Sequence, residues 1–439
     1  MLNQLPSELN RHWFERYVCF GFLLLCGLLQ GSVMYYFEPM LVHSQIVRFI
    51  VFDSLFCLVL LWYYFRFTLS SERMRWNKPL FFTFFLLLYL FFSAVIKGLV
   101  GENETAFILR GAHTFIYAII IFLFVWAVGI RASLRAQFIL FHGALLGTVV
   151  TIAMAYIIFP TGQDFFYGRD NLGLDISGLT VLYSHKVKVV PYLMSYLAAY
   201  YMWAMLHAKS FRAYILFFVV VVGLLLISIM TNMRSAIVGV IEGIMIAVLV
   251  TSALKMTALK LMKMLAFFMA GIFSLVVVWG LFFSQDMWMQ SQIADKMKHG
   301  VASQDGNRLD GMLQAFGLTQ DDSVEGYGYG MGAGYERRGG LLKRMNPPDS
   351  GFYHIYVTHG LLFVYIISGI LLFSCIRMFK AVVRTRNHPD HQFVVANFAA
   401  IIMLFLSHFN DSPWVVIADV SNAALVMAVT LHYTKRTKK

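Results

Sequence analysis

Residues 346–376 read NPPDSGFYHIYVTHGLLFVYIISGILLFSCI, a polar turn that passes directly into an apolar segment. Pro347 and Pro348 end any regular structure that precedes them. The residues that follow are apolar for long enough to cross the roughly 30 Å of hydrocarbon in a bilayer. This junction predicts that the chain leaves a long polar interruption, about 286–350, and re-enters a membrane as a helix at residue 352.

Composition extends this interpretation to the whole chain. Apolar residues make up 59% of the 439 residues, charged residues 13%, and the mean hydropathy is +0.69. A soluble globular domain has a charged fraction near a quarter, so that class is excluded. We therefore expect an all-α polytopic integral membrane protein with one large loop before the tenth span. Runs of about twenty apolar residues predict about twelve spans, at 17–37, 46–65, 79–99, 107–129, 136–160, 179–207, 213–231, 235–253, 264–284, 352–376, 392–409 and 413–433.

The distribution of charge predicts the orientation. The formal net charge of +12 would suggest nucleic acid in a soluble protein, but more than half of the 35 Lys and Arg residues fall in alternate short connections and at the two ends. Cytoplasmic loops retain Lys and Arg. Both termini are therefore predicted to be cytoplasmic and the polar loop to face outward. The expected parts are a nine-helix unit at 1–284, the loop at 285–351, and three further helices with a basic tail at 352–439.

The cysteines predict neither a disulfide framework nor a metal site. Cys19, Cys26, Cys57 and Cys375 all fall inside predicted spans and lack metal-ligand spacing. No repeated half with matching broken helices is visible, which would have favoured a secondary transporter. We expect no metal and no cofactor.

Several basic residues are expected near the outer ends of spans, where an ionisable group is costly unless it is paired or hydrated. Arg234, in Thr231-Asn232-Met233-Arg234-Ser235, lies at the outer junction of the seventh and eighth spans. Lys186 and Lys188 lie a turn or two into the sixth span from its outer side, and Arg110 and Arg169 lie near the same face. Around an outward cavity they would suit a pyrophosphate or an acidic sugar. The alternative is that each anchors at the interface or pairs locally.

Acidic residues within spans have a simpler expected role. Asp53, Glu242 and Asp419 are placed there by the apolar pattern. We expect them to be structural partners of buried cations rather than catalysts.

Asp349 has two interpretations. It precedes the tenth span, where its carboxylate could cap the helix by accepting backbone amides. It could instead be a general base at the membrane surface, beside Tyr353 and His354. His354 and His359 are five residues apart, so they do not share a helix face and are interpreted as interfacial residues rather than a metal pair. The glycine-rich run 326–334 lacks the Gly-Lys-Ser/Thr ending of a nucleotide loop.

The order of these motifs resembles the bacterial O-antigen ligase and Wzy-type polysaccharide polymerase superfamily. Thr231-Asn232-Met233-Arg234-Ser235 looks like the family's mid-chain arginine motif, and Gly306-Asn307-Arg308 looks like its loop arginine. The family's closing motif has a glycine eleven residues after a key residue, as Gly360 follows Asp349 here. Ligases have histidine at that position, whereas many polymerases have an Asp-Ser or Asp-Asn pair, as in Asp349-Ser350. The resemblance therefore favours the polymerase branch.

The resemblance implies an activity. It implies an integral-membrane glycosyltransferase of the bacterial inner membrane that joins polyprenyl-pyrophosphate-linked repeat units at the periplasmic face without a metal or cofactor. Asp349 would be the base, and Arg308 and Arg234 would neutralise the departing pyrophosphate. Lys186, Lys188, Arg110, Arg169, Tyr353 and His354 would contact substrate. The expected partners are the lipid-linked donor, a glycan acceptor, membrane lipids and a chain-length regulator, and no nucleic acid.

Two alternatives remain at this stage. One is an O-antigen ligase that transfers finished glycan to lipid A-core. The other is a lipid-linked glycan transporter or flippase, which predicts charges spread through the depth of several helices. The charges here gather near the outer ends and a long loop lies on one side only, which together with the motif order favours an enzyme.

Overall fold

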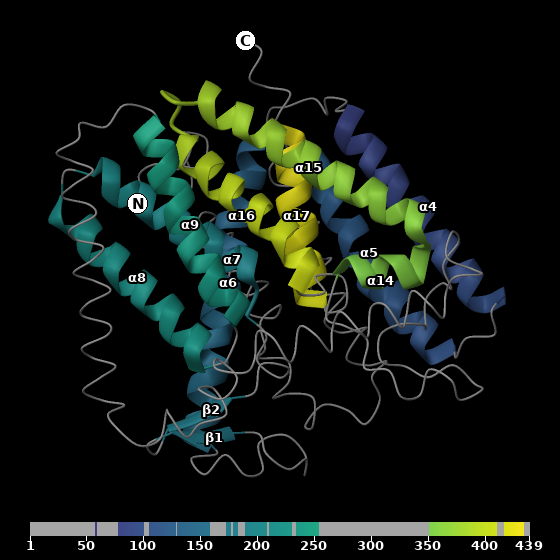
Figure 1. Ribbon diagram of the computed structural model, residues 1–439, viewed down its shortest axis with the longest axis horizontal. Coiled ribbons are helices and arrows are strands. Elements are labelled where there is room, and N and C mark those ends of the chain that lie inside the picture. The colour runs from purple at the N-terminus through teal and green to yellow at the C-terminus, as the bar shows by residue number, and fades with distance from the viewer. Residues whose placement is uncertain are drawn as a thin grey trace.

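The computed structural model of the chain describes residue 58 and residues 78–100, 105–128, 130–158, 173–176, 179–182, 189–208, 210–230, 234–253, 351–410 and 417–433. These form a helical bundle with one small β-hairpin (Figure 1). The elements are α4 (Lys78–Val100), α5 (Thr105–Val128), α6 (Ile130–Ile158), β1 (Gly173–Ile176), β2 (Leu179–Leu182), α7 (Pro191–His207), α8 (Phe211–Met230), α9 (Arg234–Ala253), α14 (Gly351–His359), α15 (Leu361–Arg384), α16 (His391–Asn410) and α17 (Ile417–Tyr433).

The described helices are those of a membrane protein. Six of them, α4, α6, α8, α9, α15 and α16, are long and apolar enough to cross a bilayer. Shorter apolar stretches occupy Phe115–Trp126 of α5 and Asn422–Tyr433 of α17. The predicted spans 17–37 and 264–284, the predicted span 46–65 apart from residue 58, and the polar loop lie outside the described residues.

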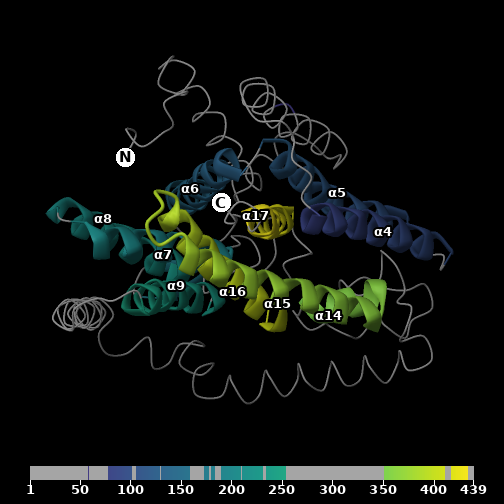
Figure 2. The same cartoon turned by 90° about the horizontal axis from the view of Figure 1, so that it is seen from above.

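Two helices hold the bundle together. Helix α17 is buried from residue 422 to residue 431 and packs against α5, α6, α15 and α16. Helix α16 packs against α7, α9, α14, α15 and α17. Seen from above, α17 lies centrally, with α4 and α5 on one side and α6 to α9 on the other (Figure 2). The core thus forms where α16 and α17 meet α6 and α7.

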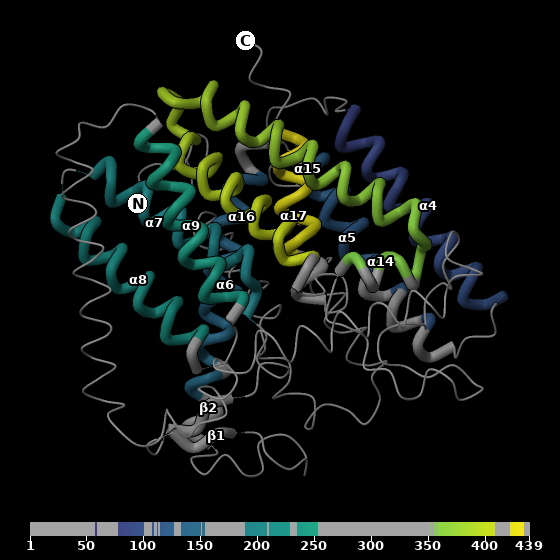
Figure 3. Tube along the Cα trace, viewed as in Figure 1, coloured from purple at the N-terminus to yellow at the C-terminus, as the bar shows by residue number. Residues whose placement is uncertain are grey.

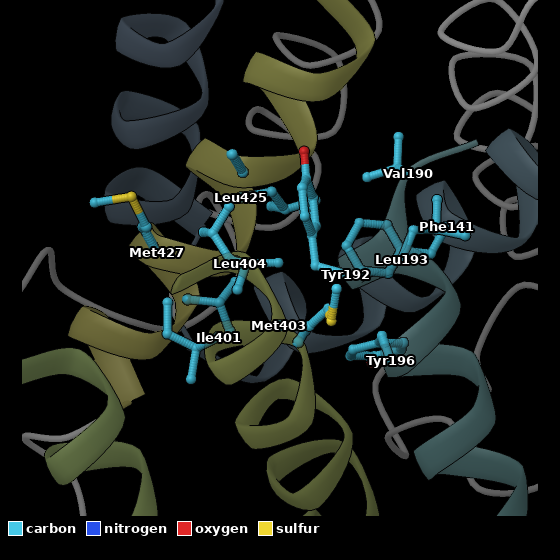
Figure 4. Close-up of a cluster of buried hydrophobic side chains, with 14 of the residues drawn as sticks. Phe141, Val190, Tyr192, Leu193, Tyr196, Ile401, Met403, Leu404, Leu425 and Met427 are labelled. Carbon is cyan, nitrogen blue, oxygen red and sulfur yellow. The ribbon is translucent and has the colours of Figure 1, made fainter. Parts of the chain in front are cut away.

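Aromatic and aliphatic side chains fill this core. Tyr192 and Tyr196 of α7 are at most 1% exposed, and the Phe141 ring of α6 meets the Tyr196 ring edge-on at 4.9 Å. They face apolar side chains of α16 and α17, including Leu404 and Leu425 (Figure 4). Such edge-to-face pairs contribute about 0.5–1.5 kcal/mol beyond their buried area. Outward-facing positions of α4, α8, α9 and α15 also carry large apolar residues, the surface that lipid covers.

The predicted sixth span, 179–207, is wrong at its start, where the otherwise helical described part of the chain has one hairpin. Leu179–Leu182 is a strand that pairs antiparallel with Gly173–Ile176, Gly173 opposite Leu182. The helix begins only at Pro191, after Val190 in extended conformation (φ −83°, ψ 114°). Proline favours the first helical position and pushes the preceding residue out of the helical region. An apolar run that contains the β-branched residues Thr180 and Val181 is compatible with a strand as well as with a membrane span.

The predicted tenth span, 352–376, is two helices rather than one. Helix α14 ends at His359 and α15 starts at Leu361, and Gly360 between them has a φ of 97°. This left-handed conformation suits glycine, which has no Cβ to clash. The chain therefore turns back on itself at Gly360, so that α14 folds beneath α15 (Figure 3). The membrane span is α15, and it runs on to Arg384.

Candidate functional site

The predicted site residues divide between described helices and the rest of the chain. Arg234 is the first residue of α9, Arg110 lies in α5, and Tyr353 and His354 lie in α14. For these four the structure describes the backbone position. Lys186, Lys188, Arg169, Arg308 and Asp349 lie outside the described residues. Convergence of the nine side chains therefore stays a prediction.

Helix α14, which begins two residues after Asp349, is held by four other helices, α4, α5, α15 and α16. The Phe352 ring lies 5.1 Å from the His408 ring of α16, between ring centroids. At its other end, the His359 ring lies 6.1 Å from both Phe115 of α5 and Phe363 of α15. His359 is 5% exposed, so it is buried between α5 and α15 and helps to fix α14; its place at the membrane interface stays a prediction. The helix that follows Asp349 in the sequence is therefore firmly packed in the bundle.

Helix α9, which begins at Arg234, is held against α7 by two glycines. A Cβ added to Gly239 would overlap the carbonyl oxygen of Pro191, and one added to Gly243 would overlap that of Ser195. Glycines four residues apart lie on one face of a helix and let two backbones approach closely in a membrane. The Gly-x-x-x-Gly spacing in the sequence indicates close helix packing, but the sequence does not indicate which helix is the partner. The contact fixes the register of α9, and with it the position of Arg234.

Glu242 lies between these glycines in sequence and bonds to α7. The Ser195 hydroxyl donates a hydrogen bond to Oε2 of Glu242. Oε1 is buried, and among the described residues it has no hydrogen-bond partner. Sequence reasoning expected a cation beside Glu242, whereas the partner found in the described part is a hydroxyl. A carboxyl group in an apolar bundle is costly unless it is hydrogen-bonded, so the Ser195 contact stabilises an otherwise unfavourable residue.

A second polar cluster joins three helices in the core. The Gln137 side-chain amide of α6 donates to Oδ1 of Asn397 at 2.7 Å, and Nδ2 of Asn397 donates to the Thr430 hydroxyl of α17 at 2.6 Å. All three residues are 0% exposed. Asn397 of α16 uses both ends of its amide and therefore sets the rotation of α6, α16 and α17 about one another. No feature of the sequence singled these residues out, because isolated Asn and Gln are common in helices.

Among the described residues, no group of three or more His, Cys, Asp or Glu side chains could hold a metal ion. The chain matches no protein-family model and no curated protein. Its candidate function therefore rests on the motifs and on the elements that carry them.

Proposed function

We propose that this protein is a membrane glycosyltransferase that polymerises lipid-pyrophosphate-linked glycan repeat units at the outer face of the bacterial inner membrane. The observation that carries the proposal is the role of Gly360. The eleven-residue spacing from Asp349 to Gly360 comprises Ser350, the nine-residue helix α14 and a glycine whose φ of 97° forms the corner before α15. The motif spacing thus has a physical counterpart: it sets one short helix between the aspartate and the membrane span.

The mid-chain arginine motif, which contains Arg234, also lies next to a well-packed helix. Arg234, which follows Thr231-Asn232-Met233 in the sequence, is the first residue of α9, and α9 packs closely against α7 at Gly239 and Gly243. The packing of α9 places the backbone of Arg234, and a preorganised positive charge is effective at stabilising a developing anion. The proposal has Arg234 and Arg308 approach the same pyrophosphate.

The proposed reaction transfers a glycosyl group between two oxygens. A hydroxyl oxygen of the acceptor glycan forms a bond to the anomeric carbon of the donor, and the bond from that carbon to the pyrophosphate oxygen breaks. Asp349 takes the hydroxyl proton, and the lipid pyrophosphate leaves with the bonding electron pair, its charge met by the two arginines. Because the donor already carries a good leaving group, no nucleotide or redox partner enters the balance.

Site variants test this proposal. Asp349→Ala, Arg234→Ala and Arg308→Ala are expected to abolish long polymer while the protein still inserts, as judged by the glycan chain-length ladder and the amount of protein in the membrane. Arg338→Ala, a charge of the same loop outside the motifs, is the matched control and should leave the ladder intact. Normal ladders in all three motif variants would contradict the site assignment.

A further inference from the structure

The basic residues of α15 form one stripe rather than a scattered group. Arg377, Lys380 and Arg384 follow a spacing of three and then four residues, which places them on one face of the helix. At 1.5 Å of rise per residue the stripe is about 10 Å long. Lys380 and Arg384 are exposed, and Arg377 is half-buried. We call these three residues the α15 basic stripe.

The α15 basic stripe borders the surface that faces lipid. Leu372, Ile376, Phe379 and Val383 are 48% to 53% exposed and follow the neighbouring face of the same helix. The Arg377 guanidinium carbon lies 5.0 Å from the centroid of the Phe373 ring, which is itself 45% exposed. A guanidinium over an aromatic face is held in place by the ring quadrupole. A positive charge is thereby fixed beside exposed hydrocarbon, two turns before the helix ends.

The surrounding sequence adds positive charge and little negative charge. Arg386 lies two residues beyond the end of the helix, and Asp390 is the sole acidic residue of 351–410. The Asp390 carboxylate lies 3.3 Å from Nδ1 of His388 and its side chain is 13% exposed. This end of α15 therefore presents a net positive surface where a span leaves the bilayer.

We propose that the α15 basic stripe binds the phosphate headgroup of an anionic phospholipid, with the acyl chains along the exposed apolar face of α15. The general preference for basic cytoplasmic loops places charge anywhere in a loop, whereas here three charges share one helix face at the edge of the lipid-facing surface. Clustered Lys and Arg residues beside a span attract anionic lipid. A soluble anion would gain nothing from the apolar face. The inference is independent of the proposed enzymatic activity.

Lipid-dependent thermal unfolding of the purified full-length protein tests this inference. Phosphatidylglycerol, cardiolipin or phosphatidylcholine is titrated into detergent micelles, and the midpoint concentration of stabilisation is recorded. We expect both anionic lipids to raise the Tm of the wild type. Arg377→Gln/Lys380→Gln/Arg384→Gln should raise the midpoint concentration about fivefold for each charge removed. Arg337→Gln/Arg338→Gln/Lys343→Gln, in the polar loop and with the same change in charge, is the matched control and should keep the wild-type midpoint.

Three results would overturn the inference: equal midpoints in the wild type and the stripe variant, equal weakening in the loop control, or equal stabilisation by phosphatidylcholine. Protection by inorganic pyrophosphate equal to that by lipid would assign the stripe to a soluble anion instead. If the triple variant does not fold, Arg384→Gln alone should raise the midpoint about fivefold. The charge-preserving Arg377→Lys/Arg384→Lys should stay within about twofold, because headgroup attraction depends mainly on charge.

Discussion

At the scale of single residues, buried polar side chains define how the helices are oriented. Asn397 bonds to Gln137 and Thr430 from the middle of a core that is otherwise apolar. Glu242 depends on Ser195 in the same way, across the contact between α7 and α9. Apolar packing alone tolerates rotation of one helix against another, whereas a buried amide with two partners accepts one arrangement. These residues therefore specify the bundle as well as stabilise it.

Replacement of Asn397 should lower the stability of the protein by more than the loss of a small side chain suggests. Asn397→Ala leaves the amide of Gln137 and the hydroxyl of Thr430 without this partner in a 0%-exposed environment, which we expect to cost about 1–3 kcal/mol of unfolding free energy. Denaturant unfolding in detergent measures it. Asn387→Ala, in the exposed turn between α15 and α16, is the control and should change stability by less than about 0.5 kcal/mol. Equal effects of the two substitutions would contradict the role of Asn397.

The Ser195–Glu242 contact predicts an energetic coupling. Ser195→Ala, Glu242→Ala and the double variant form a cycle in which a real hydrogen bond between helices gives a coupling of about 0.5–2 kcal/mol. Thermal unfolding of the four proteins under one detergent condition supplies the values. Strictly additive effects would mean that the two side chains do not stabilise one another.

At the scale of elements, three glycines determine where the motif-carrying helices lie. Gly239 and Gly243 bring the backbone of α9 against that of α7. Gly360 supplies the corner between α14 and α15. In each case the absence of a side chain is what the geometry requires, so the elements that bear Arg234 and follow Asp349 are placed by backbone contacts rather than by the motifs themselves.

Alanine substitutions separate close packing from helix propensity. Gly239→Ala and Gly243→Ala add a methyl group where a carbonyl oxygen of α7 already lies, so we expect a loss of about 1–3 kcal/mol in stability. Gly223 of α8 and Gly369 of α15 have nothing within 4 Å of an added Cβ. There alanine should be neutral or stabilising by up to about 1 kcal/mol, because it is the better helix former. The account fails if Tm falls equally in all four variants.

Gly360 should tolerate neither alanine nor valine. Its φ of 97° and ψ of 169° lie in a backbone region that is essentially restricted to glycine, because a Cβ clashes there, and a β-branched residue clashes most. We expect membrane-inserted protein and polymer length to fall in the order Gly, Ala, Val at position 360. Immunoblots of membranes and glycan ladders measure the two quantities. A valine variant as active as the wild type would show that the corner is dispensable.

At the scale of the whole molecule, the helical membrane class was predictable because it depends on composition and on the length of apolar runs. Helices α4, α8, α9 and α16 begin and end within two residues of the predicted spans 79–99, 213–231, 235–253 and 392–409. The errors at 179–207 and 352–376 have one cause: hydropathy records apolar length but not backbone conformation. Pro191 and Gly360 carried the missing information, as a helix start and a left-handed corner.

Only the motif residues of the candidate site could be predicted from the sequence, and the residues that support them could not. Motif order suggested the function and named Arg234 and Asp349, because such residues are conspicuous against apolar sequence. The residues that hold the neighbouring elements, Ser195, Gly239 and Asn397, depend on which helices meet. Helix pairing is a property of the folded bundle that one helix cannot show.

The glycan profile of a strain that lacks this protein tests the central claim most directly. A polymerase predicts that single repeat units remain attached to the acceptor lipid and that long chains return when the wild-type protein is restored, but not when Asp349→Ala is supplied. Long polymer accumulating on the carrier lipid would instead identify a ligase. Full-length polymer on the acceptor, or repeat units retained on the cytoplasmic side, would contradict the polymerase account.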